Sequence, residues 1–591
     1  MQAQETEVED STAIYRKIEE YSEKRKFTKF VHGLIFEPLS NKTVRTRNKR
    51  VNKENFKKFQ GKIIREIFIE TLDPFGYSEV DTSARPRRRI SRVGNKIHLK
   101  SKELTIWNLL LIRRNKPLDS LLIKESERLI RSQRYIRRVA ITPKQISKKS
   151  DSVDVYIRVL DSWTLIPDFA ASPSRYTAKL TERNFLGFGH QVENTYRRDM
   201  NRKDGEYSVK YTIPNIMNTY IKTTLTYDID LDNNTWKSID IDRPFFSPFA
   251  RWAGGVFVGT VSKMDSLPNL AGLQEIQPFK SSSNDIWGGN ATRIVAGSSE
   301  DARTTNLITT ARMYRINYKE RPDAIHDPEN FFSDELLVLT GIGVNSRQFV
   351  EDKYLFNYGI IEDVPTGTAL GATAGFRKKN SLRQPYLGFR ASTGTYFKYG
   401  YISSNLEYGT FFNQSRSEQG AISLQTNYFT KLVDFGSWKV RQFAKAQVII
   451  GNDRIASPGD YLTLNEDNEG IGGFNTRNLY GTKKWLLALQ TQSYSPWNAW
   501  GFRLNPYLNY TVGMLGNAKT GFSRSKLYSQ VGVGLIISND FLVFNTFQIS
   551  FSYFPSLPEV GNNIFKTNAV NTEDFGFQDF SINKPRTVYY Q

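Results

Sequence analysis

Thirteen residues near the C-terminus, Phe502–Met514, alternate in character at almost every position. One set is mainly apolar, and consists of Phe502, Leu504, Pro506, Leu508, Tyr510, Val512 and Met514. Successive side chains of a β-strand point to opposite faces, so this segment predicts a strand with one apolar and one mostly polar face. Thirteen residues are long for a soluble strand, whereas about ten tilted residues cross a bilayer in a barrel. The pattern therefore predicts a transmembrane β-strand.

The same alternation recurs along the chain. It is found at residues 227–232, 238–242, 422–428, 530–537 and 543–553. No run of about eighteen apolar residues occurs, so the sequence excludes a transmembrane helix. These patterns favour a mostly β, antiparallel transmembrane barrel, and a large soluble β protein is the alternative that they leave open.

The positive charge is concentrated in the first part of the chain. Residues 1–165 contain 37 Lys and Arg against 21 Asp and Glu, so 16 of the 21 net positive charges lie there. Such a region is attracted to phosphate-rich surfaces, either nucleic acid or anionic lipid headgroups. Nucleic acid is not expected as a partner, because no recognition-helix, stacking or zinc pattern accompanies the charge.

Signs of catalysis are missing from the sequence. The chain has 0 Cys and 4 scattered His, and it contains neither a zinc-binding helix nor a nucleophile elbow. Asp228, Asp230 and Asp232 suggest either a calcium loop or carboxylates on the polar face of a strand, and their period of two favours the latter. We therefore expect no enzyme activity, no cofactor and no metal. The first residues show no signal peptide, so we expect a mature form of an exported protein.

The order of elements predicts three parts. Residues 1–60 form a helix, at about 12–36, and a basic linker. Residues 61–165 form a small α+β domain with strands at 62–71, 137–142 and 153–160 and helices at 104–114 and 120–133. Residues 175–591 form the barrel.

This plan is similar to a known family. The order β-α-α-β-β and the joining segment at 129–139 resemble a POTRA domain. Residues 182–189 (ERNFLGFG) resemble the segment that opens the barrel in the BamA/TamA-like outer-membrane assembly superfamily, and residues 532–535 and 539–544 resemble its late strands. The resemblance covers about residues 61–591. It implies a single periplasmic POTRA-like domain before a sixteen-stranded barrel in the outer membrane of a Gram-negative bacterium.

The resemblance implies two sites that act without catalysis. The first is an edge strand of the POTRA-like domain that binds a client by strand addition, formed by Arg138, Val139, Ala140, Ile141 and Thr142. The second is the barrel seam, where the first strand meets a last strand at about 575–590. Its predicted residues are Leu180, Phe580, Ile582, Pro585 and Val588. Since proline has no N–H for a ladder, Pro585 suggests either a weakly paired strand that can open or a position beyond the membrane.

The family also has an in-folded extracellular loop, which here corresponds to Gly472, Gly473, Phe474 and Arg477. The arginine of the family pattern is replaced by Gly472, and Gln490 stands where a carboxylate is expected. This departure puts the usual charge pairing of the loop in doubt.

Together these features predict an outer-membrane insertase or translocase for unfolded client proteins. Its partners would be outer-membrane lipid, client chains, and accessory lipoproteins or periplasmic chaperones. A passive pore or surface receptor on the same scaffold is one alternative, and a two-partner-type secretion transporter is another.

Overall fold

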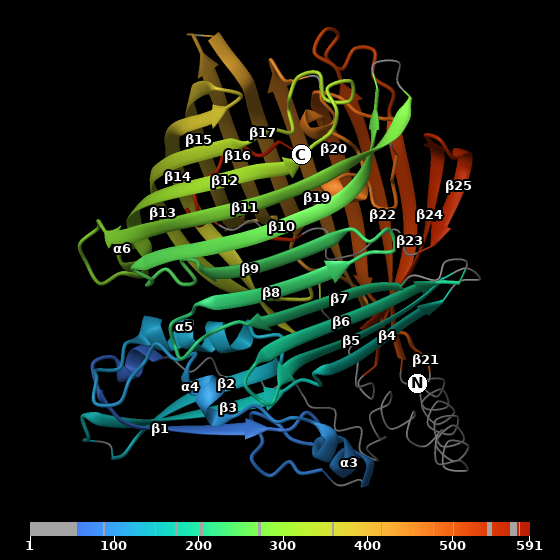
Figure 1. The fold of residues 1–591 in the computed structure, drawn as a ribbon. Coiled ribbons are helices and arrows are strands. Elements are labelled where there is room, and N and C mark those ends of the chain that lie inside the picture. The colour runs from blue at the N-terminus through green and yellow to red at the C-terminus, as the bar shows by residue number, and fades with distance from the viewer. Residues whose placement is uncertain are drawn as a thin grey trace. The chain divides into compact units, whose positions relative to one another are not determined.

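The structure is a computed structural model, shown in Figure 1. It describes residues 56–590 apart from these gaps: 87–88, 148, 172–174, 201–204, 270–272, 357–359, 415, 456, 477, 500–501, 540–545, 568–575 and 578–579. The helix predicted at 12–36 lies outside the described residues. Strands account for 61% of the structure and helices for 8%, which confirms the prediction of a mostly β protein. No helix among the described residues is long and apolar enough to span a membrane.

The chain divides into two compact units. Unit 1 is residues 1–243 with two short pieces, 257–261 and 540–544, and unit 2 is the remainder. The domain boundary predicted between residues 165 and 175 falls inside unit 1.

Unit 1 begins with a small domain. Its elements are η1 (Phe56–Phe59), β1 (Ile63–Leu72), α3 (Arg89–Ile97), α4 (Glu103–Trp107), α5 (Ser120–Arg131), β2 (Ile136–Gln145) and β3 (Ser152–Asp161). The three strands lie in the order β1-β3-β2, with β1 parallel and β2 antiparallel to β3. Ile64, Ile106, Leu110, Ile130 and Ile157, each at most 1% exposed, form part of its core.

The predicted elements of the small domain are confirmed with small changes. All three strands fall within a few residues of their predicted bounds. The Asp119 side chain caps α5 by accepting hydrogen bonds from the N–H groups of Leu121 and Leu122. Two differences remain: the first predicted helix ends at Trp107, not near residue 114, and residues 89–97, for which no helix was predicted, form α3.

Six further strands complete the description of unit 1. They are β4 (Leu165–Ala171), β5 (Arg175–Phe185), β6 (His190–Asp199), β7 (Gly205–Ile213), β8 (Lys222–Ile229) and β9 (Thr235–Arg243). Each pairs antiparallel with the next. The strand predicted through residue 232 ends at Ile229. Asp230 instead organises the following turn, since its side chain accepts hydrogen bonds from the N–H groups of Asp232 and Asn234.

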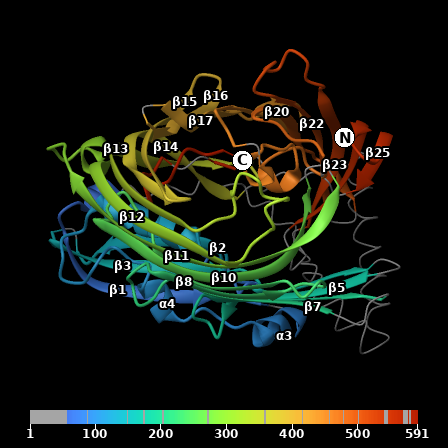
Figure 2. The same ribbon diagram turned by 45° about the horizontal axis from the view of Figure 1, so that its top comes forward.

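Unit 2 is a large antiparallel sheet. Its elements are β10 (Trp252–Pro268), β11 (Gln274–Arg293), α6 (Glu300–Thr304), β12 (Thr305–Glu320), β13 (Glu335–Lys353), β14 (Ile361–Lys379), β15 (Leu382–Phe397), β16 (Gly400–Asn413), β17 (Arg416–Thr430), β18 (Val433–Phe435), β19 (Trp438–Asn452), η2 (Pro458–Asp460), η3 (Glu466–Asn468), β20 (Lys483–Tyr494), β21 (Asn498–Ala499), β22 (Phe502–Gly516), β23 (Tyr528–Asn539), β24 (Thr546–Leu557) and β25 (Gly561–Thr567). The sheet is strongly curved, and the C-terminal end of the chain lies on its concave side (Figure 2).

The strand predicted from Phe502 to Met514 is confirmed as β22. Its apolar side chains are exposed and its polar side chains are buried, which is the reverse of a strand in a soluble protein. On β22, Leu508 is 48% exposed while its neighbour Asn509 is 4% exposed. On β24, Phe551 is 58% exposed and Ser552 is 1% exposed. Apolar side chains thus cover the outer face and polar side chains are buried on the inner face, the arrangement expected where the outer face meets lipid.

Two parts of the predicted barrel are not supported. The number of sixteen strands and the closure of the barrel are not confirmed. The predicted last strand at 575–590 is wrong, because β25 is the last strand and the described residues of 576–590 contain none. We refer to residues 576–590 as the C-terminal segment.

Candidate functional site

The predicted client-binding residues lie on an edge of the small domain. Arg138 to Thr142 belong to β2, which ends the three-stranded sheet, so the prediction of an edge strand is confirmed. Ile141 is buried in the core, whereas Val139 and Ala140 are half-buried and Arg138 is exposed. An edge strand offers unpaired main-chain groups to an added strand. That β2 binds a client stays a prediction.

The ERNFLGFG segment connects the small domain to the strands of unit 1. It spans the last residues of β5 and the turn before β6, and Asn184 in it is fully buried. The Asn184 side chain donates hydrogen bonds to the carbonyl oxygen of Leu99 at 2.9 Å and to Oγ of Ser101 at 3.1 Å. It also accepts one from the N–H of Gly189 at 2.7 Å. The segment is therefore a junction that Asn184 organises.

Main-chain contacts close this junction. The N–H of Lys102 and the hydroxyl of Thr105 both donate to the carbonyl oxygen of Gly187, each at 2.9 Å. Gly187 has φ +77°, and a Cβ there would lie 2.5 Å from the carbonyl oxygen of Lys100. Glycine is required at this position by both its conformation and the close approach of the loop.

A second turn, between β7 and β8, also contacts the small domain. The side chains of Asn215 and Asn218 donate to the carbonyl oxygen of Asn108 at 2.9 and 2.6 Å, and the Tyr220 hydroxyl donates to that of Leu109 at 2.9 Å. These carbonyls follow the C-terminus of α4, where helical partners are lacking. The small domain is thus joined to the strands of unit 1 at two turns.

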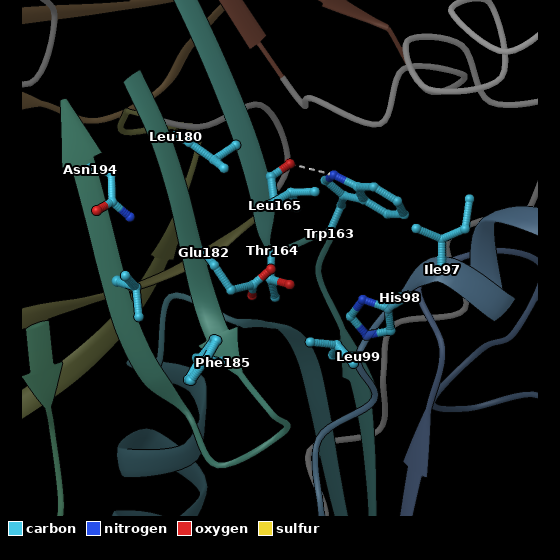
Figure 3. A pocket seen from close by; sticks show the side chains of 11 residues that line it. Ile97, His98, Leu99, Trp163, Thr164, Leu165, Leu180, Glu182, Phe185 and Asn194 are labelled. Carbon is cyan, nitrogen blue, oxygen red and sulfur yellow. Dashed lines mark hydrogen bonds between the residues drawn. The ribbon is translucent and has the colours of Figure 1, made fainter. Parts of the chain in front are cut away.

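An apolar cavity of about 310 Å³ lies beside the first junction (Figure 3). It is lined by Ile97, His98, Leu99, Trp163, Thr164, Leu165, Leu180, Glu182, Phe185, Val192 and Asn194. The indole N–H of Trp163 donates to the carbonyl oxygen of Leu165 at 2.5 Å. Leu180, predicted to lie at the seam, is a residue of β5 and lines this cavity.

Asp154 and Asp73 are among the carboxyl groups of the small domain whose pKa values are shifted. The hydrogen bond from the Arg65 guanidinium, at 2.8 Å, lowers the pKa of Asp154. Burial raises the pKa of Asp73, which lies near Asp161, and nearby Lys100 and His98 only partly oppose this effect. Neither group lies in a constellation with catalytic geometry, and no group of His, Asp and Glu among the described residues is arranged to hold a metal ion.

The loop between β19 and β20 carries the residues predicted to fold inward. Phe474 is fully buried in a cluster with Leu464, Ile471, Leu486 and Phe554. Gly472 and Gly473 are half-buried, and Arg477 lies outside the described residues. The inward packing of Phe474 agrees with the predicted loop.

Main-chain contacts stabilise this loop where the family pattern has a charge pair. The N–H of Gly473 donates to the Glu466 carboxylate at 2.9 Å, and the Lys566 ammonium donates to the carbonyl oxygen of Gly473 at 2.6 Å. Gln490, at the expected carboxylate position, is fully buried and donates to Gln492 at 3.4 Å. Burial of Phe474 and these contacts therefore hold the described part of the loop.

The remaining predicted seam residues lie against the inner face of unit 2. Phe580 is fully buried, and the N–H of Val588 donates to the Tyr386 hydroxyl at 2.7 Å. The carbonyl oxygen of Pro585 accepts a hydrogen bond from Arg312 at 3.1 Å. The described residues of the segment lie outside any strand, and side chains of the sheet bind main-chain groups of the segment.

Sequence reasoning missed several residues on which these sites depend. Asp285 and Glu407, each 5% exposed at the side chain, are two acidic groups that form ion pairs with the C-terminal segment. They lie at buried positions of strands whose outer face is apolar, and this inward alternation is the signal that could have indicated them. Asn184 lay within a recognised segment, but nothing in its spacing revealed the contact with residues 99–101.

No family model matches the chain, and no curated protein matches it. Among solved structures, it is similar to BamA from Haemophilus ducreyi lacking POTRA domains 1–3, with 11% identity, 85% of this chain and 83% of that chain covered, and a TM-score of 0.29. It is similar to CdiB from Acinetobacter baumannii, with 10% identity, 93% and 97% covered, and a TM-score of 0.40. CdiB from Escherichia coli gives 10% identity, 86% and 75% covered, and a TM-score of 0.42. All three scores are low, so these likenesses establish neither the family nor the function.

Proposed function

We propose that this chain is an outer-membrane protein that receives unfolded polypeptides at its small domain and inserts or exports them. It would be a single-POTRA member of the BamA/TamA-like superfamily, with the N-terminal region in the periplasm of a Gram-negative bacterium. The observation that carries the proposal is the junction within unit 1, where a domain with an open edge strand is bonded to the turn between β5 and β6. The inverted faces of β22 and β24 support a membrane location.

The proposed mechanism uses no catalytic group. An extended client adds to β2 through main-chain hydrogen bonds, which tolerate many sequences. Its folding free energy in the bilayer drives insertion, since unpaired main-chain groups are costly in lipid. Lipid contacts the outer face, and accessory lipoproteins or periplasmic chaperones deliver the client.

Proline substitutions in β2 test the proposal. The N–H groups of neighbouring strand residues point to opposite sides. One of the two substitutions Val139→Pro and Ala140→Pro therefore removes an N–H that faces β3, and the other removes an N–H that faces outward. The variant that keeps the β3 ladder should fold normally but assemble an unfolded outer-membrane client several-fold more slowly in liposomes. Hydrogen exchange of β1 and β3 identifies that variant.

The assay also distinguishes the rival functions. A passive pore or receptor predicts that liposomes with the wild-type protein assemble the client no faster than empty liposomes. Wild-type rates in a correctly folded proline variant would exclude β2 as the receiving edge.

A further inference from the structure

The inner face of unit 2 is shaped to receive the side chains of the C-terminal segment. Glycine lies where those side chains approach most closely. A Cβ at Gly394 would lie 2.2 Å from the Phe580 ring, and a Cβ at Gly343 would lie 2.2 Å from the end of Ile582. A Cβ at Gly451 would lie 2.6 Å from the Tyr590 ring. Three different strands, β13, β15 and β19, provide these glycines.

Side chains of the same face bind the main chain of the segment. Asn427, Asn345 and Arg390 donate to the carbonyl oxygens of Gly576, Phe580 and Ser581, at 3.2, 3.4 and 3.3 Å. Further along, Arg312 donates to Pro585, and the Tyr386 hydroxyl and Glu407 accept from the N–H groups of Val588 and Tyr589. Such contacts recognise an extended main chain whatever its sequence.

Charge complements shape in the middle of the segment. The Lys584 ammonium lies 2.7 Å from the Asp285 carboxylate, and the Arg586 guanidinium lies 2.6 Å from that of Glu407. Both carboxylates are 5% exposed at the side chain, whereas Lys584 and Arg586 keep 35% and 44% of theirs exposed. Each carboxylate also meets an arginine of the inner face, since Arg312 lies 2.8 Å from Asp285 and Arg390 lies 3.7 Å from Glu407. The acidic groups therefore belong to the inner face, and the C-terminal segment adds a second, more solvated cation to each.

We propose that this inner face is a binding track for an extended polypeptide, and that the C-terminal segment is its resident, exchangeable occupant. The incoming chain carries two apolar side chains two residues apart, as at Phe580 and Ile582, followed by two basic ones, as at Lys584 and Arg586. The inference rests on the proposed function in one respect: the incoming chain is a client in transit. Exchange is feasible because the described residues of the segment are held by side-chain contacts and not by a strand ladder.

A disulfide in the full chain tests exchange. A Cβ at Gly341 would lie 3.5 Å from the Cβ of Pro585, which suits a disulfide, where this distance is about 3.5–4.5 Å. Only the Thr310 hydroxyl, 2.6 Å from that Cβ, has to turn away. Since the chain has 0 Cys, the variant G341C/P585C contains a single pair of thiols. The two single-cysteine variants are the controls.

The probe is a fluorescent peptide with the sequence of residues 576–591. We expect the reduced double variant and both controls to bind it saturably, and the oxidised double variant to bind at least ten-fold more weakly. A peptide with the changes K584E and R586E should bind more weakly than the unchanged peptide, because it replaces the cations at Asp285 and Glu407 by carboxylates. Equal binding by the oxidised and reduced forms, or binding by neither, overturns the proposal.

A second measurement covers the case in which the double variant does not fold. The wild-type protein is treated with the peptide carrying a photo-crosslinker at the position of Ile582, and the crosslinked site is mapped. Crosslinks to β13 or β14, where Gly343 and Gly371 approach Ile582, support the track, and crosslinks elsewhere or none overturn it.

Client assembly on the same liposomes separates the two proposals. Assembly lost only on oxidation supports both. Peptide exchange without client assembly in any form contradicts the proposed function and leaves the track standing. Client assembly unaffected by oxidation, with no peptide exchange, contradicts the track and leaves the function standing.

Discussion

Replacing Asn184 by alanine should open the junction between the small domain and the β5–β6 turn. The change removes two hydrogen bonds that the amide donates, to Leu99 and Ser101, and one that it accepts from Gly189. A hydrogen bond contributes about 1 kcal/mol net, and an orphaned buried N–H adds a penalty. The loss is therefore at least about 3 kcal/mol, which corresponds to a ~150-fold larger equilibrium constant for local opening.

Hydrogen exchange measured by mass spectrometry on the full protein checks this value. Peptides that cover residues 99–105 and 184–189 should exchange up to ~150-fold faster, while peptides of β22 stay unchanged. Thr105→Val, which removes only the hydrogen bond to Gly187, should lower the free energy of local opening by about 1 kcal/mol. Asn184→Asp keeps the acceptor for Gly189 but places an oxygen against the Leu99 carbonyl, so it should also open the junction. Unchanged exchange in Asn184→Ala would refute the assignment of this residue as the organiser of the junction.

Three further predictions concern separate parts of the chain. Phe474→Ala should lower the unfolding free energy by about 3–5 kcal/mol, because it leaves a cavity at a fully buried site, and it should make the loop between β19 and β20 sensitive to protease. Leu508→Arg should lower the unfolding free energy in liposomes by about 2–4 kcal/mol, the cost of an arginine that faces lipid near the bilayer midplane, and a change near zero would place residue 508 away from the midplane. The raised pKa of Asp73 means that folding favours its protonated form, so its contribution to stability should decline as the pH rises above the ordinary value of 3.8. Asp73→Asn should remove this decline and stabilise the small domain at pH 7, as urea unfolding at several pH values can measure.

Local patterning was sufficient to predict β22, the three strands of the small domain and α5. The alternation at Phe502–Met514 identified β22 because one face of that strand is apolar throughout. The strand predicted at 62–71 was identified by its Ile and Phe residues, and it agrees with β1. Each of these signals depends only on residues close in sequence.

The C-terminal segment shows the limit of such reasoning. An extended chain that docks on a sheet through its side chains has the same period of two as a strand within the sheet. Pro585 indicated weak pairing, but the alternative to pairing depended on Arg312, Tyr386 and Glu407, which are distant in sequence. Contacts of this kind leave no local pattern.

The candidate sites were predicted in part for the same reason. The edge position of β2 was implied by the resemblance to a POTRA domain, and Phe474 was found through the family pattern. The family pattern could not indicate what replaces the missing arginine at Gly472. The contacts of Gly473 with Glu466 and Lys566 supply that answer, and they involve main-chain atoms that any residue type carries.

The two turns that join the small domain to its neighbouring strands have a mechanical consequence. The two attachments are the β5–β6 turn at Asn184 and the β7–β8 turn at Tyr220. The chain itself is a third attachment, since only residues 162–164 separate β3 from β4. A body held at three points that do not lie on one line has no rotation left, so the orientation of β2 is fixed for as long as both turns stay closed. Opening one turn leaves a hinge between the other turn and residues 162–164.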